Sequence, residues 1–219
     1  MAFGVALRVW GSYACFTRPE MKVERVSYDV ITPSACRGIL EAIYWKPEIM
    51  WIIDKIHVLK PIKHTNIRRN ELSGVVSTSN ASTVMKGGDK ELQTIIESER
   101  QQRASLVLKD VEYIIEAHFV LRKRNDDNTA KHKEMFERRA KKGQCYYQPY
   151  LGVREFSAFF EYVNPNENFQ DSPLRGEINL GWMLYDIDFE NNMETLFFEA
   201  KMKDGIIDLT KLSPDEVRR

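Results

Sequence analysis

Histidine is the side chain that most readily gives and takes protons near neutral pH, and the sequence contains four of them. His118 lies in residues 107–121, where apolar and polar residues alternate with the period of a strand. Its position is off the main apolar face, so it is a candidate for proton transfer as well as an ordinary surface histidine. The other three, His57, His64 and His132, show no constellation with acids or cysteines at metal-ligand spacing.

Arginine suits phosphate oxygens because its planar guanidinium presents parallel donors. The candidates for phosphate contacts are Lys46, Arg18, Arg37, Arg68 and Arg69. Basic residues concentrate at 55–70, which contain no acid, and at 131–142, although solvated surfaces also explain such runs. The whole chain carries 32 Lys and Arg against 32 Asp and Glu, so any phosphate binding must be local.

Aromatic side chains on a surface could stack on unpaired bases, as they do in sheet-based RNA binders. Tyr13, Trp45, Tyr146 and Tyr147 are of this type. Tyrosine and tryptophan are equally common in packed cores, so the sequence does not single out one of them as a stacking platform.

No metal or cofactor is predicted. Asp186, Asp188 and Glu190 lie at alternate positions, for which a solvent-facing strand edge is a simpler explanation than a metal site. The three cysteines lie far apart and are expected to be reduced thiols.

The elements that must position these residues follow from hydrophobic periodicity. Thr32 as an N-cap and Pro33 at the first helical position begin a helix whose apolar stripe stops before Pro47. Strands are predicted at 3–10, 50–59, 107–121 and 155–163, and a second, basic helix at 130–142. This order is that of a ferredoxin-like α+β fold, an antiparallel sheet with two helices on one face.

We therefore expect a ferredoxin-like domain over residues 1–164 and a small C-terminal antiparallel β-sheet over residues 165–219. Within the first, the polar residues 73–105 are expected to form a mobile insertion, with a short helix near 91–102. No stretch approaches the roughly 20 apolar residues that span a bilayer, and a signal-peptide cleavage pattern is missing, so a cytoplasmic location is expected.

Several short sequence motifs, spread in order over almost the whole chain, resemble those of a known family. They are ACFTRPE at 14–20, TPSACRGILEAIYWKP at 32–47, IRRNE at 67–71, EAHF at 116–119, GQC at 143–145, PYLG at 149–152, REF at 154–156 and GWMLYD at 181–186. On these words the chain resembles the type I-C (Dvulg) CRISPR RNA-processing proteins of the RAMP superfamily.

The resemblance implies a ferredoxin-like RAMP domain that binds the repeat stem-loop of precursor CRISPR RNA and cleaves it without a metal. The 2′-hydroxyl would attack the adjacent phosphate and leave a 2′,3′-cyclic phosphate. The protein would then stay on the 5′ handle of the mature CRISPR RNA. It would do so beside the backbone and large subunits of the type I-C surveillance complex (Cascade), in antiviral defence.

The resemblance also implies a catalytic tyrosine, lysine and histidine. The tyrosine matches Tyr44 and the histidine matches His118, but Glu116 and Ala117 stand just before that histidine, so the lysine is missing there. Tyr44 could also be a core residue of the first helix, and as a base it would need a nearby cation because tyrosine has a pKa near 10. Two alternatives stay open: a non-catalytic protein that caps the RNA handle, and a metal-dependent DNA nuclease that uses the C-terminal acids.

Overall fold

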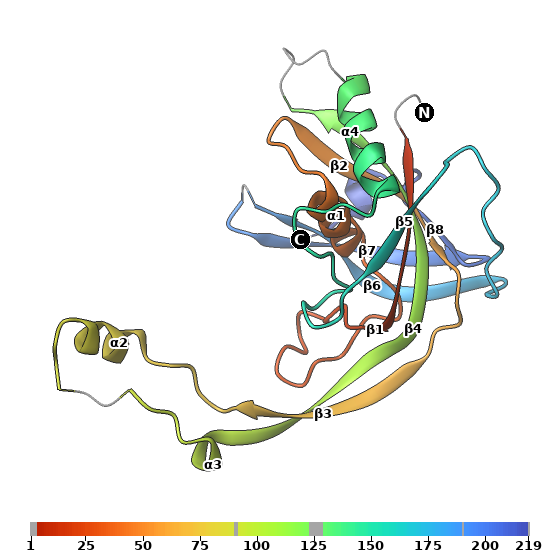
Figure 1. Cartoon of the computed structure of the whole chain (residues 1–219). Coiled ribbons are helices and arrows are strands. Elements are labelled where there is room, and N and C mark those ends of the chain that lie inside the picture. The colour runs from red at the N-terminus through yellow and green to blue at the C-terminus, as the bar shows by residue number, and fades with distance from the viewer. Residues whose placement is uncertain (1–3, 90–91, 123–128, 190, 219) are drawn as a thin grey trace.

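The computed structural model describes residues 4–89, 92–122, 129–189 and 191–218, which form an α+β protein around a large antiparallel sheet (Figure 1). Its strands are β1 (Val5–Ala14), β2 (Ile49–Val58), β3 (His64–Leu72), β4 (Arg100–Leu121), β5 (Phe159–Val163), β6 (Glu177–Asp188), β7 (Glu194–Lys203) and β8 (Ile206–Asp208). Its helices are α1 (Pro33–Ile43), α2 (Thr78–Met85), α3 (Ile96–Glu99) and α4 (Thr129–Lys141), with a 3₁₀ turn at Pro214–Glu216.

The strands of the sheet follow the order β5-β1-β4-β2-β8-β7-β6, and β3 pairs with the N-terminal half of β4. Side chains alternate across β4, so Ile115 and Phe119 face one side of the sheet. That side is covered by α1 and α4. Trp51 of β2 links the layers, because its ring contacts Phe119 at 5.4 Å and Phe136 of α4 at 4.9 Å, and its indole nitrogen donates to the Tyr44 carbonyl.

The first predicted helix is confirmed with its cap. Thr32 accepts a hydrogen bond from the Ala35 amide at 3.2 Å, and Pro33 occupies the first helical position. The predicted apolar stripe, Cys36, Ile39, Leu40 and Ile43, is buried to 1% exposure or less. The second helix and the alternation of residues 107–121 are confirmed as well.

Some strand bounds differ from the prediction, and one strand was not predicted. β1 continues to Ala14 because β4 offers it partners as far as Leu108. The last predicted strand begins only at Phe159. β3 was missed, because its residues alternate between exposed and half-buried without a fully buried face, so the strand has no hydrophobic signal.

The described part of residues 73–105, which were expected to be an insertion, lies at the far end of the β3–β4 ribbon, which projects away from the rest of the molecule (Figure 1). This segment contains α2, which was not predicted, and α3, which falls inside the predicted helical range. Arg100 to Ser105 already belong to β4, because they pair with Ile67–Leu72 of β3. Strand pairing therefore orders part of the segment.

Residues 165–219, predicted to form a small antiparallel sheet, contain the antiparallel pair β6 and β7. The short strand β8 then pairs with β2 at Lys55–Asp208, Ile56–Ile207 and His57–Ile206, and so joins the C-terminal strands to the main sheet. Over the described residues, no helix is long and apolar enough to cross a membrane.

Candidate active site

His118 has a carboxylate partner. Its Nδ1 lies 2.9 Å and 3.0 Å from the two carboxylate oxygens of Asp54, a residue at the register shift of β2. The His118 side chain is 26% exposed and that of Asp54 9% exposed. As predicted, His118 points away from the apolar face of β4.

The surface near His118 is rich in acid. Glu116, two residues away on the same face, accepts a 2.5 Å hydrogen bond from His57 Nε2, which holds the pKa of the carboxyl below its ordinary value against the opposing effect of burial. Asp208 lies opposite Lys55 on the neighbouring strand and its charge acts on Glu116 as well. Asp208 also pairs with Lys211 at 3.2 Å, so His57, His118 and Lys211 each have a carboxylate partner on this face.

Tyr44 lies elsewhere, at the C-cap of α1, where it is 2% exposed. Its hydroxyl is 2.8 Å from Nδ1 of His132, a residue of α4 that is 6% exposed. Arg139, seven residues further along α4 and therefore on the same helix face, donates to the Ile43 carbonyl at 2.9 Å. Its guanidinium carbon lies 5.2 Å from the centre of the Tyr44 ring. Lys131, directly before His132, is exposed.

The two side chains matched to the family's tyrosine and histidine are therefore not brought together. His132 contacts Phe119 at 6.0 Å between ring centres, so Tyr44 and His132 lie on the helix side of the sheet. His118, the residue before Phe119, points to the opposite side. One active site cannot contain both Tyr44 and His118 without a rearrangement of the sheet.

His132 was not among the residues predicted to form the site. The contact with Tyr44 joins residues 88 positions apart, which periodicity cannot reveal. One signal was present: His132, Phe136 and Ala140 recur at helical spacing and are the three buried residues of α4. A histidine on the only buried stripe of a basic helix must face the core, where it needs a hydrogen-bond partner.

Three of the predicted phosphate-binding arginines already have protein partners. Arg37 Nη2 lies 2.6 Å from Asp186, and Nη1 lies 3.1 Å from Glu41. Burial acts to lower the pKa of Arg37, but the two carboxylates outweigh it and raise the pKa. Arg69 is paired with Glu155 at 2.5 Å, and Arg18 lies over the ring of Tyr28 at 4.5 Å.

The other two predicted phosphate-binding residues differ from these three arginines in their exposure and in their charge partners. Arg68 on β3 and Lys46 after α1 are both exposed, and neither forms an ion pair with any carboxylate that the structure describes. Arg68 lies on the ribbon, whereas Lys46 lies two residues from Tyr44. Lys46 is therefore the predicted cation nearest in sequence to the Tyr44 and His132 pair.

The C-terminal acids have partners of their own. Asp186 pairs with Arg37, and Asp188 accepts hydrogen bonds from the backbone and side-chain nitrogens of Asn191 at 3.2 Å and 2.7 Å. Glu190 lies outside the described residues. Since Asp186 is bound to a guanidinium, it is poorly suited to hold a cation.

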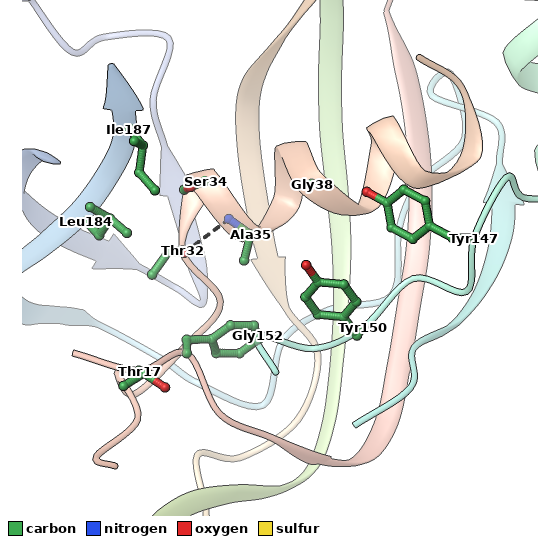
Figure 2. A pocket seen from close by; sticks show the side chains of 11 residues that line it. Thr17, Thr32, Ser34, Ala35, Gly38, Tyr147, Tyr150, Gly152, Leu184 and Ile187 are labelled. Atoms are coloured by element: carbon green, nitrogen blue, oxygen red, sulfur yellow. Dashed lines mark hydrogen bonds between the residues drawn. The ribbon is translucent and has the colours of Figure 1, made fainter. Parts of the chain in front are cut away.

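A pocket of about 310 Å³ lies along α1, with Tyr147 and Tyr150 from the segment after α4 near Gly38, and with Leu184 and Ile187 of β6 near Thr32 and Ser34 (Figure 2). Its lining residues carry no formal charge. Gly152 closes one end at φ +86°, and a Cβ there would collide with the backbone of Cys15. The PYLG word therefore has a packing role, and the pocket lacks the positive charge of a phosphate site.

Comparisons with known proteins place the chain in a family. Residues 4–210 match the family model described as CRISPR-associated protein (Cas_Cas5). A protein of Mannheimia succiniciproducens named CRISPR pre-crRNA endoribonuclease Cas5d is 56% identical, over 100% of both chains. A Thermus thermophilus protein of the same name is 40% identical over 97% of this chain and 94% of its own.

Solved structures agree with this assignment. A crystal structure of a CRISPR-associated protein has a TM-score of 0.71 and 27% identity, and the alignment covers 99% of this chain and 96% of the other. A functionally uncharacterized Streptococcus mutans protein shares the fold, with a TM-score of 0.67, 24% identity and coverage of 99% and 97%. The chain therefore belongs to the Cas5d family of type I-C CRISPR-associated proteins.

Proposed function

We propose that this chain is a metal-independent endoribonuclease that cleaves repeat stem-loops in precursor CRISPR RNA. It then remains on the 5′ handle as a subunit of the type I-C surveillance complex. The relatives at 56% and 40% identity, both named CRISPR pre-crRNA endoribonucleases, support the substrate. The observation that carries the catalytic part is the 2.8 Å contact between Tyr44 and His132.

The proposed catalytic residues are Tyr44, Lys131 and His132. The family resemblance asks for a tyrosine, a histidine and a lysine just before the histidine. His118 lacks that lysine, but His132 has it in Lys131. The alternative of a non-catalytic handle-capping protein rested on the missing lysine. If Lys131 is that lysine, this reason for the alternative no longer applies.

These residues can supply what the reaction needs. Attack by the 2′-oxygen on phosphorus requires a base for the hydroxyl proton, and breaking the bond from phosphorus to the 5′-oxygen requires an acid. Tyr44 and His132 are hydrogen-bonded to each other, and in the proposed reaction one of them takes the proton of the 2′-hydroxyl while the other gives a proton to the 5′-oxygen. Lys131 and Arg139 would balance the charge that grows on the phosphate oxygens, a role that otherwise falls to a metal.

The fold supports the same proposal. We infer that β1, α1, β2, β4, α4 and β5 form a ferredoxin-like RAMP unit within residues 1–164, because the sheet order β5-β1-β4-β2 is the one such a unit requires. Residues 73–105 form its insertion and residues 165–219 its C-terminal extension. Both helices of this unit contribute to the proposed site.

The test uses purified protein, cognate repeat RNA and excess chelator. We expect one cut near the base of the stem and a product that ends in a 2′,3′-cyclic phosphate. RNA with a 2′-deoxyribose at the cleaved position should stay intact while still binding. Cleavage that disappears in chelator, or that continues on the 2′-deoxy substrate, would contradict the proposed mechanism.

A further inference from the structure

A second pocket, of about 590 Å³, opens at the C-terminal end of α1. We call it the α1 end pocket. Its main lining residues are Glu41, Trp45, Lys46, Arg139, Tyr146 and Tyr147. It adjoins the proposed catalytic pair, because Trp45 and Lys46 directly follow Tyr44 and Arg139 lies over the Tyr44 ring.

The aromatic side chains of this pocket are unusually exposed. Trp45 is 57% exposed, Tyr146 86% and Tyr147 46%. The backbone of Tyr146 is held against α1, because the Tyr146 amide donates to the Ala42 carbonyl at 2.8 Å. Large aromatic rings that gather on a surface mark a binding site, and flat, open rings suit the faces of unpaired bases.

The charges of the pocket favour an anion. Lys46 and Arg139 both line it, and neither forms an ion pair with a carboxylate in the part of the chain that the structure describes. The acid of the pocket, Glu41, already accepts a hydrogen bond from Arg37 at 3.1 Å. Two unpaired cations beside three open aromatic rings fit the two parts of a nucleotide, its phosphate and its base.

We propose that the α1 end pocket binds an unpaired nucleotide of the RNA beside the scissile phosphate. Its base stacks on Trp45 or Tyr146, and its phosphate contacts Lys46 and Arg139. This inference rests on the proposed function, since it assigns part of the same RNA to a neighbouring site. It also requires a single-stranded flank, because a base inside the stem is already stacked and cannot enter the pocket.

The test compares two labelled RNA probes by fluorescence anisotropy with the full-length protein. The first is the cognate repeat stem-loop with its unpaired flanks, carrying 2′-deoxyribose at the flanking positions so that it cannot be cut. The second is the same stem-loop trimmed to a blunt end. The variants are Trp45→Ala, Tyr146→Ala and Trp45→Phe, with Trp182→Ala as the control because that tryptophan is also exposed, at 46%, but lies on β6.

We expect Trp45→Ala and Tyr146→Ala each to weaken binding of the flanked probe by about tenfold and to leave the blunt probe within about twofold of wild type. Trp45→Phe, which keeps a stacking ring, should bind nearly as wild type, and Trp182→Ala should have no effect. Unchanged binding of the flanked probe by both alanine variants, or equal weakening of both probes, would overturn the inference while the proposed function stands. A wild-type protein that binds neither probe would contradict the proposed function as well.

Discussion

Replacing Tyr44 by phenylalanine removes one oxygen atom from the proposed site and leaves the ring in place. The ring should keep its contact with Arg139, while His132 Nδ1 loses a partner at 2.8 Å. Loss of such a buried hydrogen bond costs about 1 kcal/mol, which corresponds to a fall in melting temperature of about 2–4 °C for a domain of this size. Since folded domains have about 5–15 kcal/mol of stability, nearly all of the variant should stay folded.

The effect on cleavage should be far larger than the effect on stability. A group that transfers protons in the transition state contributes about 100-fold to 10,000-fold, so the single-turnover rate of Tyr44→Phe should fall by at least about 100-fold. The assay is cleavage of labelled repeat RNA with enzyme in excess, read on a denaturing gel, beside urea unfolding of the same preparations.

Tyr113→Phe is the matched control, because Tyr113 is also buried, at 2% exposure, and burial raises its pKa. Its hydroxyl is hydrogen-bonded to the backbone of Ile31, whereas that of Tyr44 contacts His132. This variant should lose similar stability and keep its cleavage rate. If Tyr44→Phe instead cleaves within about threefold of wild type while it loses stability, Tyr44 is a core residue and the proposed chemistry is refuted.

The remaining predictions concern the ion pairs and cations. Arg37→Ala should cost about 2 kcal/mol in urea unfolding, because it leaves Asp186 without its partner, yet it should change RNA affinity little. The bond from His57 lowers the pKa of Glu116, so Glu116 stabilises the fold above its ordinary pKa of 4.5, and this contribution is lost as the pH falls through the lowered value. The free energy of unfolding of Glu116→Gln should therefore fall less between neutral and acidic pH than that of wild type. An unchanged pH profile would contradict this assignment. Lys46→Ala and Lys131→Ala should each reduce the slope of log affinity against log salt by about 1, whereas equal slopes in wild type and variants would exclude phosphate contacts there.

Features that depend only on residues close together in the sequence could be predicted. The Thr32 cap, the Pro33 start and the buried stripe of α1 are all encoded within twelve residues, and the alternation of β4 is encoded in its own side chains. β3 could not be predicted because its partner, and not its composition, makes it a strand. The pairing of β8 with β2 is likewise a long-range contact without a local signal.

The candidate site also contains features with a local sequence signal and features that depend on long-range contacts. Tyr44 and Lys46 were identified from a sequence word, and their place at the end of α1 followed from the helix prediction. The histidine that contacts Tyr44 could not be predicted, because His118 and His132 both lie in well-formed elements and only the packing of α4 on the sheet decides which one meets Tyr44. The Asp54 partner of His118 was missed for the same reason, since it depends on the register shift in β2.

A direct comparison of two alanine variants tests whether the histidine of the active site is His132. Single-turnover cleavage of cognate repeat RNA is measured in excess chelator for wild type, His132→Ala and His118→Ala, with melting curves to establish that each variant is folded. We expect His132→Ala to lose at least about 100-fold in rate and His118→Ala, in which the replaced side chain faces the other side of the sheet, to stay within about threefold of wild type. A folded His132→Ala that cleaves normally beside an inactive His118→Ala would contradict this expectation.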